Sequence, residues 1–192
     1  MAFTERSAAT RSAILSAARK LLAERGYEGT TIRAVAGMVG IDPSMVMRYY
    51  ENKAGLFSAA IDLDLNLQEV EPPAPEKVGE VLIRHFLSRW EGNLADEAIM
   101  LLLRSATTNP VAAERIRAIF TSQIASFVVR VARCDDAQAT HRAGLLSTQL
   151  LGLAFVRYVV ELEPIVSMDV EKLVHDMAPV LQYYLAGDLT VR

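Results

Sequence analysis

The chain has 192 residues, 52% of them hydrophobic, which fits one large domain or two small ones with a well-packed interior. Its single cysteine, Cys134, excludes an intramolecular disulfide framework, and its most apolar long run, residues 143–156, is shorter than the ~20 residues that cross a bilayer, so we expect a cytoplasmic protein. The net charge of −3 combines +3 in residues 1–57 with −6 in residues 58–192, a division typical of a basic head that meets a polyanion.

Helical periodicity dominates the chain, and no alternating pattern with hairpin turns occurs, so an all-α fold is expected. The first helix carries one apolar stripe and ends at Gly26, at a position that favours a left-handed residue. Thr30 or Thr31 caps a second helix, which closes at Gly40.

A third short helix is predicted to begin at Pro43. Asp42 is a favoured N-cap, and Pro43 occupies the first helical position, where its missing N–H costs nothing. Val46 and Tyr50 lie four residues apart and are expected to point inward. Because a tight turn at Gly40 joins the second and third helices, the three helices predict a helix-turn-helix, whose third helix enters the major groove of DNA.

The outward side of this third helix carries groups that can read bases. Ser44 can hydrogen-bond to more than one base edge, and Arg48 can pair bidentately with guanine. The thioethers of Met45 and Met47 are flexible apolar groups that can touch a thymine methyl. Tyr49 is placed to reach a phosphate from the edge of the groove.

A fourth helix is predicted from Asn52 to about Val70, before the three prolines of residues 71–77. Lys53 at its first position faces the positive end of the helix dipole, which is unfavourable unless an anion docks there. Free N–H groups together with a lysine form a phosphate clamp, whose affinity falls as salt rises. The alternative is that Lys53 is only a solvated surface residue.

The run Ile14–Phe57 resembles the DNA-binding region of the TetR/AcrR family of bacterial transcriptional regulators. The resemblance implies an all-α protein with an N-terminal three-helix helix-turn-helix domain at residues 1–57. A larger helical domain at residues 58–192 would bind an effector and hold the dimer, so that two heads read the halves of a palindrome. The matching features are an alanine-rich first helix, Gly26-Tyr27, Thr30-Thr31, Ala36, Gly40, Tyr49-Tyr50 and Lys53–Phe57.

One position departs from the family pattern. Members usually have a tyrosine that contacts phosphate where Met47 stands, so an apolar base contact is our replacement hypothesis for this residue. The predicted DNA-contacting residues are Thr31, Arg33, Asp42, Pro43, Ser44, Met45, Met47, Arg48, Tyr49 and Lys53.

The last two helices have an unusually apolar character. Between Ala143 and Val160 the only charge is Arg157, and a helix that is apolar nearly all round is buried on more than one side. Paired across a two-fold axis, two such hairpins form a four-helix interface, which the resemblance also implies; a monomeric core is the alternative. The candidate interface residues are Leu145, Gly152, Phe155, Val156, Val159, Val174, Leu181 and Tyr184.

Beyond the three prolines, helices are predicted at residues 76–92, 96–106, 111–133, 137–162 and 169–186.

The middle helices are expected to enclose a site for a small hydrophobic effector. Arg104 and Gln123 are the polar groups that could orient a ligand among apolar side chains, although such a stripe is also the pattern of an ordinary core. The full candidate set is Phe86, Trp90, Met100, Leu103, Arg104, Phe120, Gln123, Ile124 and Phe127.

The sequence shows no pattern of catalysis, and we expect no cofactor and no metal. The three histidines, His85, His141 and His175, lie far apart, and neither a Gly-rich phosphate loop nor a Gly-x-Ser-x-Gly elbow occurs. The favoured function is therefore a homodimeric repressor of a DNA operator that a small effector releases. The alternative is a dimeric DNA-binding protein without such an effector, controlled by a protein partner.

Overall fold

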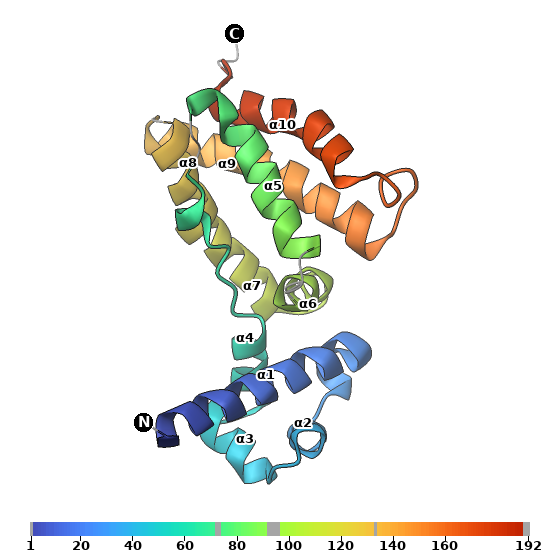
Figure 1. Cartoon of the computed structure of the whole chain (residues 1–192). Helices are drawn as coiled ribbons and strands as arrows, with labels where there is room; N and C mark the ends of the chain where they lie inside the picture. Colours follow the sequence, from blue (N-terminus) through green and yellow to red (C-terminus); the bar gives the residue numbers. More distant parts are fainter. Residues whose placement is uncertain (1, 72–73, 92–96, 133, 190–192) are drawn as a thin grey trace. The chain divides into compact units, whose positions relative to one another are not determined.

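The computed structural model describes residues 2–71, 74–91, 97–132 and 134–189, with side chains from residue 7 onward. The all-α prediction is confirmed, since the described residues form helices and no strand (Figure 1). The helices are α1 (Ala2–Gly29), α2 (Ile32–Val39), α3 (Pro43–Tyr50), α4 (Lys53–Ala60), η1 (Leu67–Glu69), η2 (Pro75–Lys77), α5 (Val78–Glu91), α6 (Glu97–Ser105), α7 (Pro110–Ile119), η3 (Phe120–Ile124), α8 (Ala125–Ala132), α9 (Asp136–Ala154), η4 (Phe155–Val159) and α10 (Val170–Ala186).

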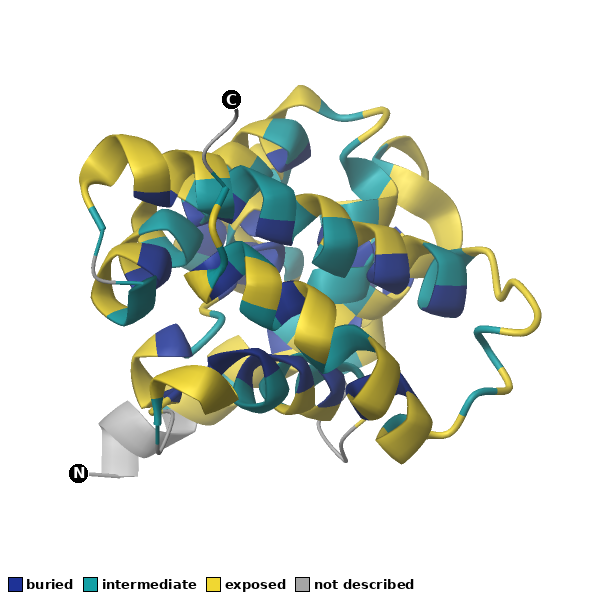
Figure 2. Cartoon of the chain, turned by 90° about the horizontal axis from the view of Figure 1, so that it is seen from above, coloured by how far each residue is buried: buried dark blue, intermediate teal, exposed yellow. Residues whose placement is uncertain are grey.

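The helices group into two compact units, each with its own interior. The first unit consists of Met1–Leu63 and Glu97–Ile116, and the second of Asp64–Asp96 and Arg117–Arg192. Thus α6 and most of α7 belong to the same unit as the four N-terminal helices. Figure 2 shows how buried positions alternate with exposed ones along the helices.

The N-terminal helices of the first unit bury large apolar side chains. Ile14, Val35 and Val46 are each fully buried, and Phe57 is nearly so. The helical turns of α1 are interrupted at Gly26, whose φ of 68° is positive as predicted, but α1 continues beyond this kink to Gly29 instead of ending there. Gly40 ends α2 with a φ of 74°, which lets α3 begin only three residues later.

The fourth helix is much shorter than predicted, because α4 ends at Ala60 rather than near Val70. Beyond it, the Asp64 carboxylate accepts a hydrogen bond from Asn66 N at 2.8 Å, and Asn66 adopts a φ of 53°. Such local side-chain bonds compete with helical hydrogen bonds, so the helix does not resume at these two residues. Within the first unit, Arg115 of α7 binds the Asp62 carboxylate and donates to Leu63 O at 3.1 Å. These bonds hold the residues that follow α4 against α7.

Two other predicted helices differ in detail. The predicted helix at residues 111–133 is α7, η3 and α8 in succession, where η3 is a π-helical turn. The predicted helix at residues 137–162 ends in a second π-helical turn, η4, at Val159. π-helical turns inside long helices often mark functional or adaptable positions.

The second unit packs α5, α8, α9 and α10 around a core that includes Ile83, Val128, Leu146 and Leu181. The most extensive contact between helices of this unit lies between α5 and α10, which lie next to each other (Figure 1). A Cβ atom at Gly79 would lie 2.4 Å from Ala178 O, so only glycine fits there. Its N–H donates to Gln182 Oε1 at 2.9 Å, which satisfies a donor at the start of α5.

Candidate nucleic-acid interface

The third helix begins as the sequence predicted, at Pro43 with Asp42 as its N-cap. The Asp42 carboxylate accepts from Ser44 N at 2.8 Å, and hydrogen bonding by Ser44 lowers the pKa of that carboxyl below its usual value. Val46 and Tyr50 are buried as predicted, and the Tyr50 hydroxyl donates to Arg11 O at 3.3 Å. The start of α3 is therefore capped, and its inner side is fixed to the unit.

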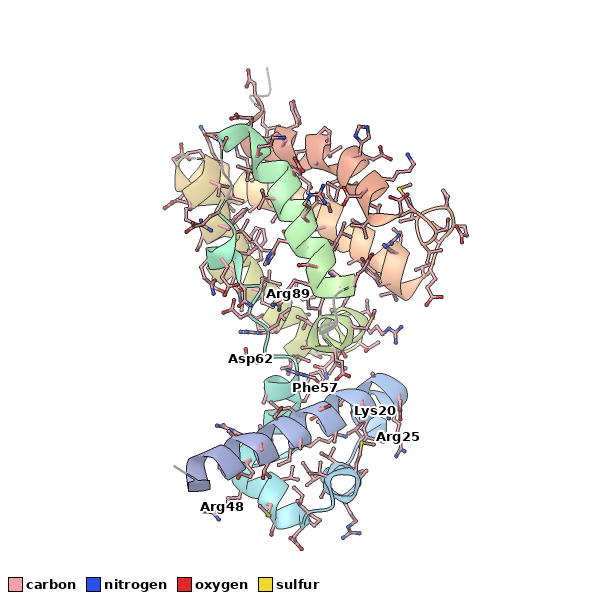
Figure 3. All side chains as sticks on the ribbon, in the orientation of Figure 1. Lys20, Arg25, Arg48, Phe57, Asp62 and Arg89 are labelled. Carbon is pink, nitrogen blue, oxygen red and sulfur yellow. The ribbon has the colours of Figure 1, made fainter. Side chains whose placement is uncertain are left out.

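The opposite side of α3 is exposed over four residues, which we call the reading face: Ser44, Met45, Met47 and Arg48. The fractional exposure is 38% for Met45 and 43% for Met47. Figure 3 shows the Arg48 side chain directed away from its unit. The four side chains are thus accessible to a partner, as the predicted base contacts require.

Tyr49 lies at the edge of the reading face and is half-buried. Its hydroxyl shares a hydrogen bond with Ser7 Oγ of α1 at 3.1 Å, and its ring lies 6.3 Å from that of Tyr50. This hydroxyl already has a partner in the chain, so a phosphate would compete with Ser7 for it. The phosphate contact predicted for Tyr49 stays a prediction. Ser7 gave no signal in the sequence, since the contact spans 42 positions.

Lys53 begins α4 as predicted, with the Asn52 side chain accepting from Gly55 N at 2.8 Å as the N-cap. Its ammonium, however, lies at the carboxyl end of α1. Lys53 Nζ donates to Glu28 O at 3.3 Å and lies 4.4 Å from the centroid of the Tyr27 ring. A cation is favoured at a helix C-terminus and over an aromatic face. Lys53 therefore has a structural role besides its predicted phosphate contact.

The remaining predicted DNA-contacting residues lie around the start of α2 and α3. Thr31 is exposed, and its side chain caps α2 by accepting from Ala34 N at 3.1 Å; this decides between the two predicted caps. Arg33 is exposed and Pro43 is half-buried. Met38 on α2 is 47% exposed and was not singled out in the sequence.

The candidate effector residues divide between the two units. Met100, Leu103 and Arg104 lie on α6 in the first unit, where the first two are half-buried and Arg104 is exposed. The others lie in the second unit, which is described separately below.

Aromatic side chains gather in the second unit around Trp90 of α5. Its ring stacks on that of Tyr158 with centroids 4.6 Å apart. The ring of Phe86, four residues earlier on α5, has its centroid 5.9 Å from that of Trp90. Phe120 and Ile124 on η3 are half-buried. These four predicted candidates, Phe86, Trp90, Phe120 and Ile124, have side chains that are accessible in part.

Two predicted effector residues have structural roles instead. Gln123 Oε1 accepts a hydrogen bond from Leu65 N at 2.7 Å, which fixes the chain after α4 within the second unit. Phe127 is only 3% exposed and belongs to the apolar core. A role in ligand binding for these two would require their present contacts to open.

An arginine network that the sequence did not reveal lies beside the Trp90–Tyr158 stack. Arg157 is 9% exposed; its Nε donates to Glu91 Oε1 at 2.8 Å, and its Nη1 donates to Met168 O at 2.9 Å. The Tyr158 hydroxyl donates to the same Glu91 oxygen at 2.6 Å. Burial opposes the charge of Arg157, but the Glu91 hydrogen bond and charge raise its pKa overall. The network ties η4 to α5 and to the chain before α10.

The candidate dimer residues differ widely in exposure. Val174 and Leu181 are 4% and 0% exposed in the core of the second unit, so their side chains are not available to a second chain. This corrects their assignment, because the register of α10 turns its Val180 and Tyr183 outward instead. Gly152 and Phe155 are exposed, and the half-buried candidates are Leu145, Val156, Val159 and Tyr184.

We call the exposed apolar residues on these helices the apolar surface: Leu151, Phe155, Val180 and Tyr183, with exposures from 37% to 53%. Leu151 and Phe155 lie four residues apart, and Val180 and Tyr183 lie three apart, so each pair shares one side of its helix. Neighbouring exposed apolar groups of this kind are typical of a surface that another protein covers.

The described residues contain no group of three or more His, Cys, Asp or Glu arranged to hold a metal ion. Of the helices they form, none is both long and apolar enough to cross a membrane.

Comparison with known proteins finds two matching domain families. The family described as "Bacterial regulatory proteins, tetR family" matches residues 14–60, and the family described as "Tetracyclin repressor-like, C-terminal domain" matches residues 76–185. The second match alone spans more than half of the chain. No curated protein is similar enough in sequence to count as a match.

Solved structures with the same fold span nearly the whole chain. A TetR-family regulator from Streptomyces coelicolor A3 is 29% identical, with a TM-score of 0.62 over 92% of this chain and 94% of that chain. NalD, the secondary repressor of the MexAB-OprM multidrug efflux pump in Pseudomonas aeruginosa, is 21% identical, with a TM-score of 0.72 over 96% and 99%. The SmeT–triclosan complex is 21% identical, with a TM-score of 0.68 over 90% of each chain.

Proposed function

Because this chain belongs to the TetR/AcrR family of bacterial transcriptional regulators, which are not enzymes, we propose that it represses transcription by binding a palindromic operator as a homodimer. The observation that carries this proposal is the division of α3 into two sides. Val46 and Tyr50 anchor its inner side, whereas the reading face stays exposed. A helix held in this way presents base-reading groups without loss of fold.

Homodimerisation is needed because one short helix contacts too few bases for specificity. Two copies related by a two-fold axis place two reading helices in successive major grooves, ~34 Å apart. The apolar surface on α9, η4 and α10 is the place that we propose for the contact, since burying it against its own copy removes large apolar groups from water. Because the proposed partner is operator DNA, we place the protein in the cytoplasm, where that DNA lies.

We further propose that a small hydrophobic effector binds among the aromatic residues of the second unit, near the neighbouring rings of Phe86 and Trp90. These side chains offer apolar area that is partly accessible. The similar fold of SmeT, solved in complex with triclosan, supports an effector of this chemical class.

Release from DNA would follow a movement of α4, which links the DNA-binding helices to the second part of the chain. An effector that binds better after this movement weakens DNA binding, and DNA weakens effector binding by the same factor. Arg19, whose Nε donates to Ala60 O at 2.9 Å, and Arg115 hold the end of α4 in its present place.

The DNA-binding proposal is tested by selecting bound sequences from a random pool of duplex DNA with the full chain. We expect an inverted repeat whose half-sites are about one helical turn apart. Recovery of sequences with no shared motif, at any salt concentration, would overturn the proposal.

The effector proposal needs a second measurement. A set of hydrophobic compounds is screened for those that raise the melting temperature, and these are then added to the protein–DNA complex. We expect at least one compound to do both. If none does, the protein binds DNA without a small effector, and a protein partner is its regulator.

A further inference from the structure

We propose that Met45 and Met47 form an oxidation site on the reading face, at which a hypohalous acid converts the thioethers to sulfoxides and releases the operator. This inference rests on the proposed DNA-binding function and adds a second, chemical route to release. No effector pocket is needed for it, because the modified atoms are those that face the DNA.

The distribution of methionines over the molecule is the first observation. The structure describes the surroundings of six methionines, and three of these, Met38, Met45 and Met47, are 47%, 38% and 43% exposed. The other three, Met100, Met168 and Met177, are half-buried. All the exposed thioethers among them therefore lie on α2 and α3, in the helix-turn-helix.

Exposure decides which of these sulfur atoms an oxidant in water reaches first. Met45 and Met47 flank Val46, which is fully buried and fixes this turn of α3. Modification of the two exposed side chains therefore leaves the core contact in place. The protein remains folded, and only the chemistry of the reading face changes.

The sulfoxide changes that chemistry in two ways. It turns an apolar group into a polar one, which no longer favours contact with a thymine methyl. It also adds a hydrogen-bond acceptor three residues before Arg48 on the same helix, where i and i+3 side chains are neighbours. A guanidinium that donates to the Met45 sulfoxide has fewer donors left for guanine.

The reaction balances with hypochlorous acid as the oxidant. The thioether sulfur loses two electrons, the oxygen–chlorine bond breaks, and a sulfur–oxygen bond forms. Chlorine takes the two electrons and leaves as chloride, and the proton passes to water. Methionine sulfoxide reductases reverse the change, one enzyme for each sulfoxide epimer, so the site can act as a switch.

The test uses the full chain with Cys134→Ser, which removes the only thiol. Hypochlorous acid is added in increasing molar ratio, sulfoxides are located by peptide mass spectrometry, and affinity for the selected operator is measured by fluorescence anisotropy. We expect a loss of ~10-fold or more once Met45 and Met47 are oxidised, comparable to one or two mismatched base pairs. Treatment with both reductases restores the affinity, and circular dichroism shows the helices intact throughout.

Matched leucine variants separate this site from general damage. In the variant Met45→Leu/Met47→Leu, whatever its starting affinity, the oxidant leaves binding unchanged. The variant Met38→Leu, which removes the third exposed thioether, responds like the parent protein.

Two results would overturn the inference: equal loss of affinity in the double leucine variant, or full affinity with both sulfoxides present. If untreated protein binds no DNA, the proposed function fails, and this inference fails with it. The untreated sample thus distinguishes the two failures.

Discussion

Lys53 lies over the ring of Tyr27, with its Nζ 4.4 Å from the ring centroid, and thereby joins the first turn of α4 to the end of α1. The Glu28 carboxylate is 4.0 Å from the same ammonium, and the Lys53 side chain keeps 29% exposure. A charge that is only loosely paired at the surface costs little to redirect toward a phosphate. In the free protein, the contacts with Tyr27 and Glu28 stabilise a lysine that is unfavourable at the N-terminus of α4. The same lysine can still turn to a DNA phosphate.

Replacing Lys53 with alanine is expected to weaken binding to all DNA sequences about equally. Loss of one phosphate contact lowers the slope of log affinity against log salt by about 1. The measurement is a salt titration of the operator complex. Lys172→Ala is the matched control, because this exposed lysine on α10 pairs with Asp176 and should leave the slope unchanged. An unchanged slope for Lys53→Ala would assign this residue to structure alone.

Replacing Arg48 with alanine is expected to relax the preference for one base position in each half-site, at a cost of about 1–3 kcal/mol there. Arg48→Lys keeps the charge but not the bidentate pairing, so it should retain the salt dependence and lose the discrimination. Both are measured by repeating the selection from random DNA. Arg104→Ala, at an exposed arginine on α6, should leave the selected motif intact.

The cap of α3 is expected to weaken at low pH. Because Ser44 lowers the pKa of Asp42 in the folded chain, this carboxylate stabilises the fold above its ordinary value near 3.8, and the stabilisation is lost as the pH falls through the lower folded value. Asn is an equally good N-cap that does not titrate. The melting temperature of the wild type should therefore fall further between pH 6 and pH 3 than that of Asp42→Asn. Parallel curves for the two proteins would contradict this role.

Placing a charge on the apolar surface is expected to separate the dimer. Phe155→Glu should weaken dimerisation by at least ~100-fold, because a two-fold interface loses the same apolar contact twice and buries two charges. Sedimentation velocity gives the oligomeric state, and operator affinity should fall with it. Val129→Glu, at a residue on α8 of similar exposure, is the control and should remain dimeric. A dimeric Phe155→Glu protein would place the interface elsewhere.

Removing the buried arginine is expected to destabilise the second unit. Arg157→Ala should lower the free energy of unfolding by ~3 kcal/mol, because Glu91 and three backbone carbonyls lose their donor. Arg157→Lys should not restore it, since one ammonium cannot reach all these acceptors. Urea unfolding provides the measurement. Arg84→Ala breaks an exposed pair with Glu171 and should shift the midpoint little; an equal shift would contradict the special role of Arg157.

Local patterns in the sequence were sufficient for the DNA-binding helices. The cap at Asp42, the proline at position 43 and the spacing of Val46 and Tyr50 act within one or two turns, so they predict both the start of α3 and its exposed side. The family resemblance of Ile14–Phe57 is confirmed by the comparisons.

Contacts between residues distant in the chain were decided only by the tertiary structure. The partners of Lys53 and Arg157 come from other helices, and the burial of Leu181 depends on how α10 packs on its neighbours. An apolar helix looks the same in sequence whether its side chains meet their own core or a second copy. Hydrophobic periodicity records how much surface must be buried, and only packing selects which neighbour buries it.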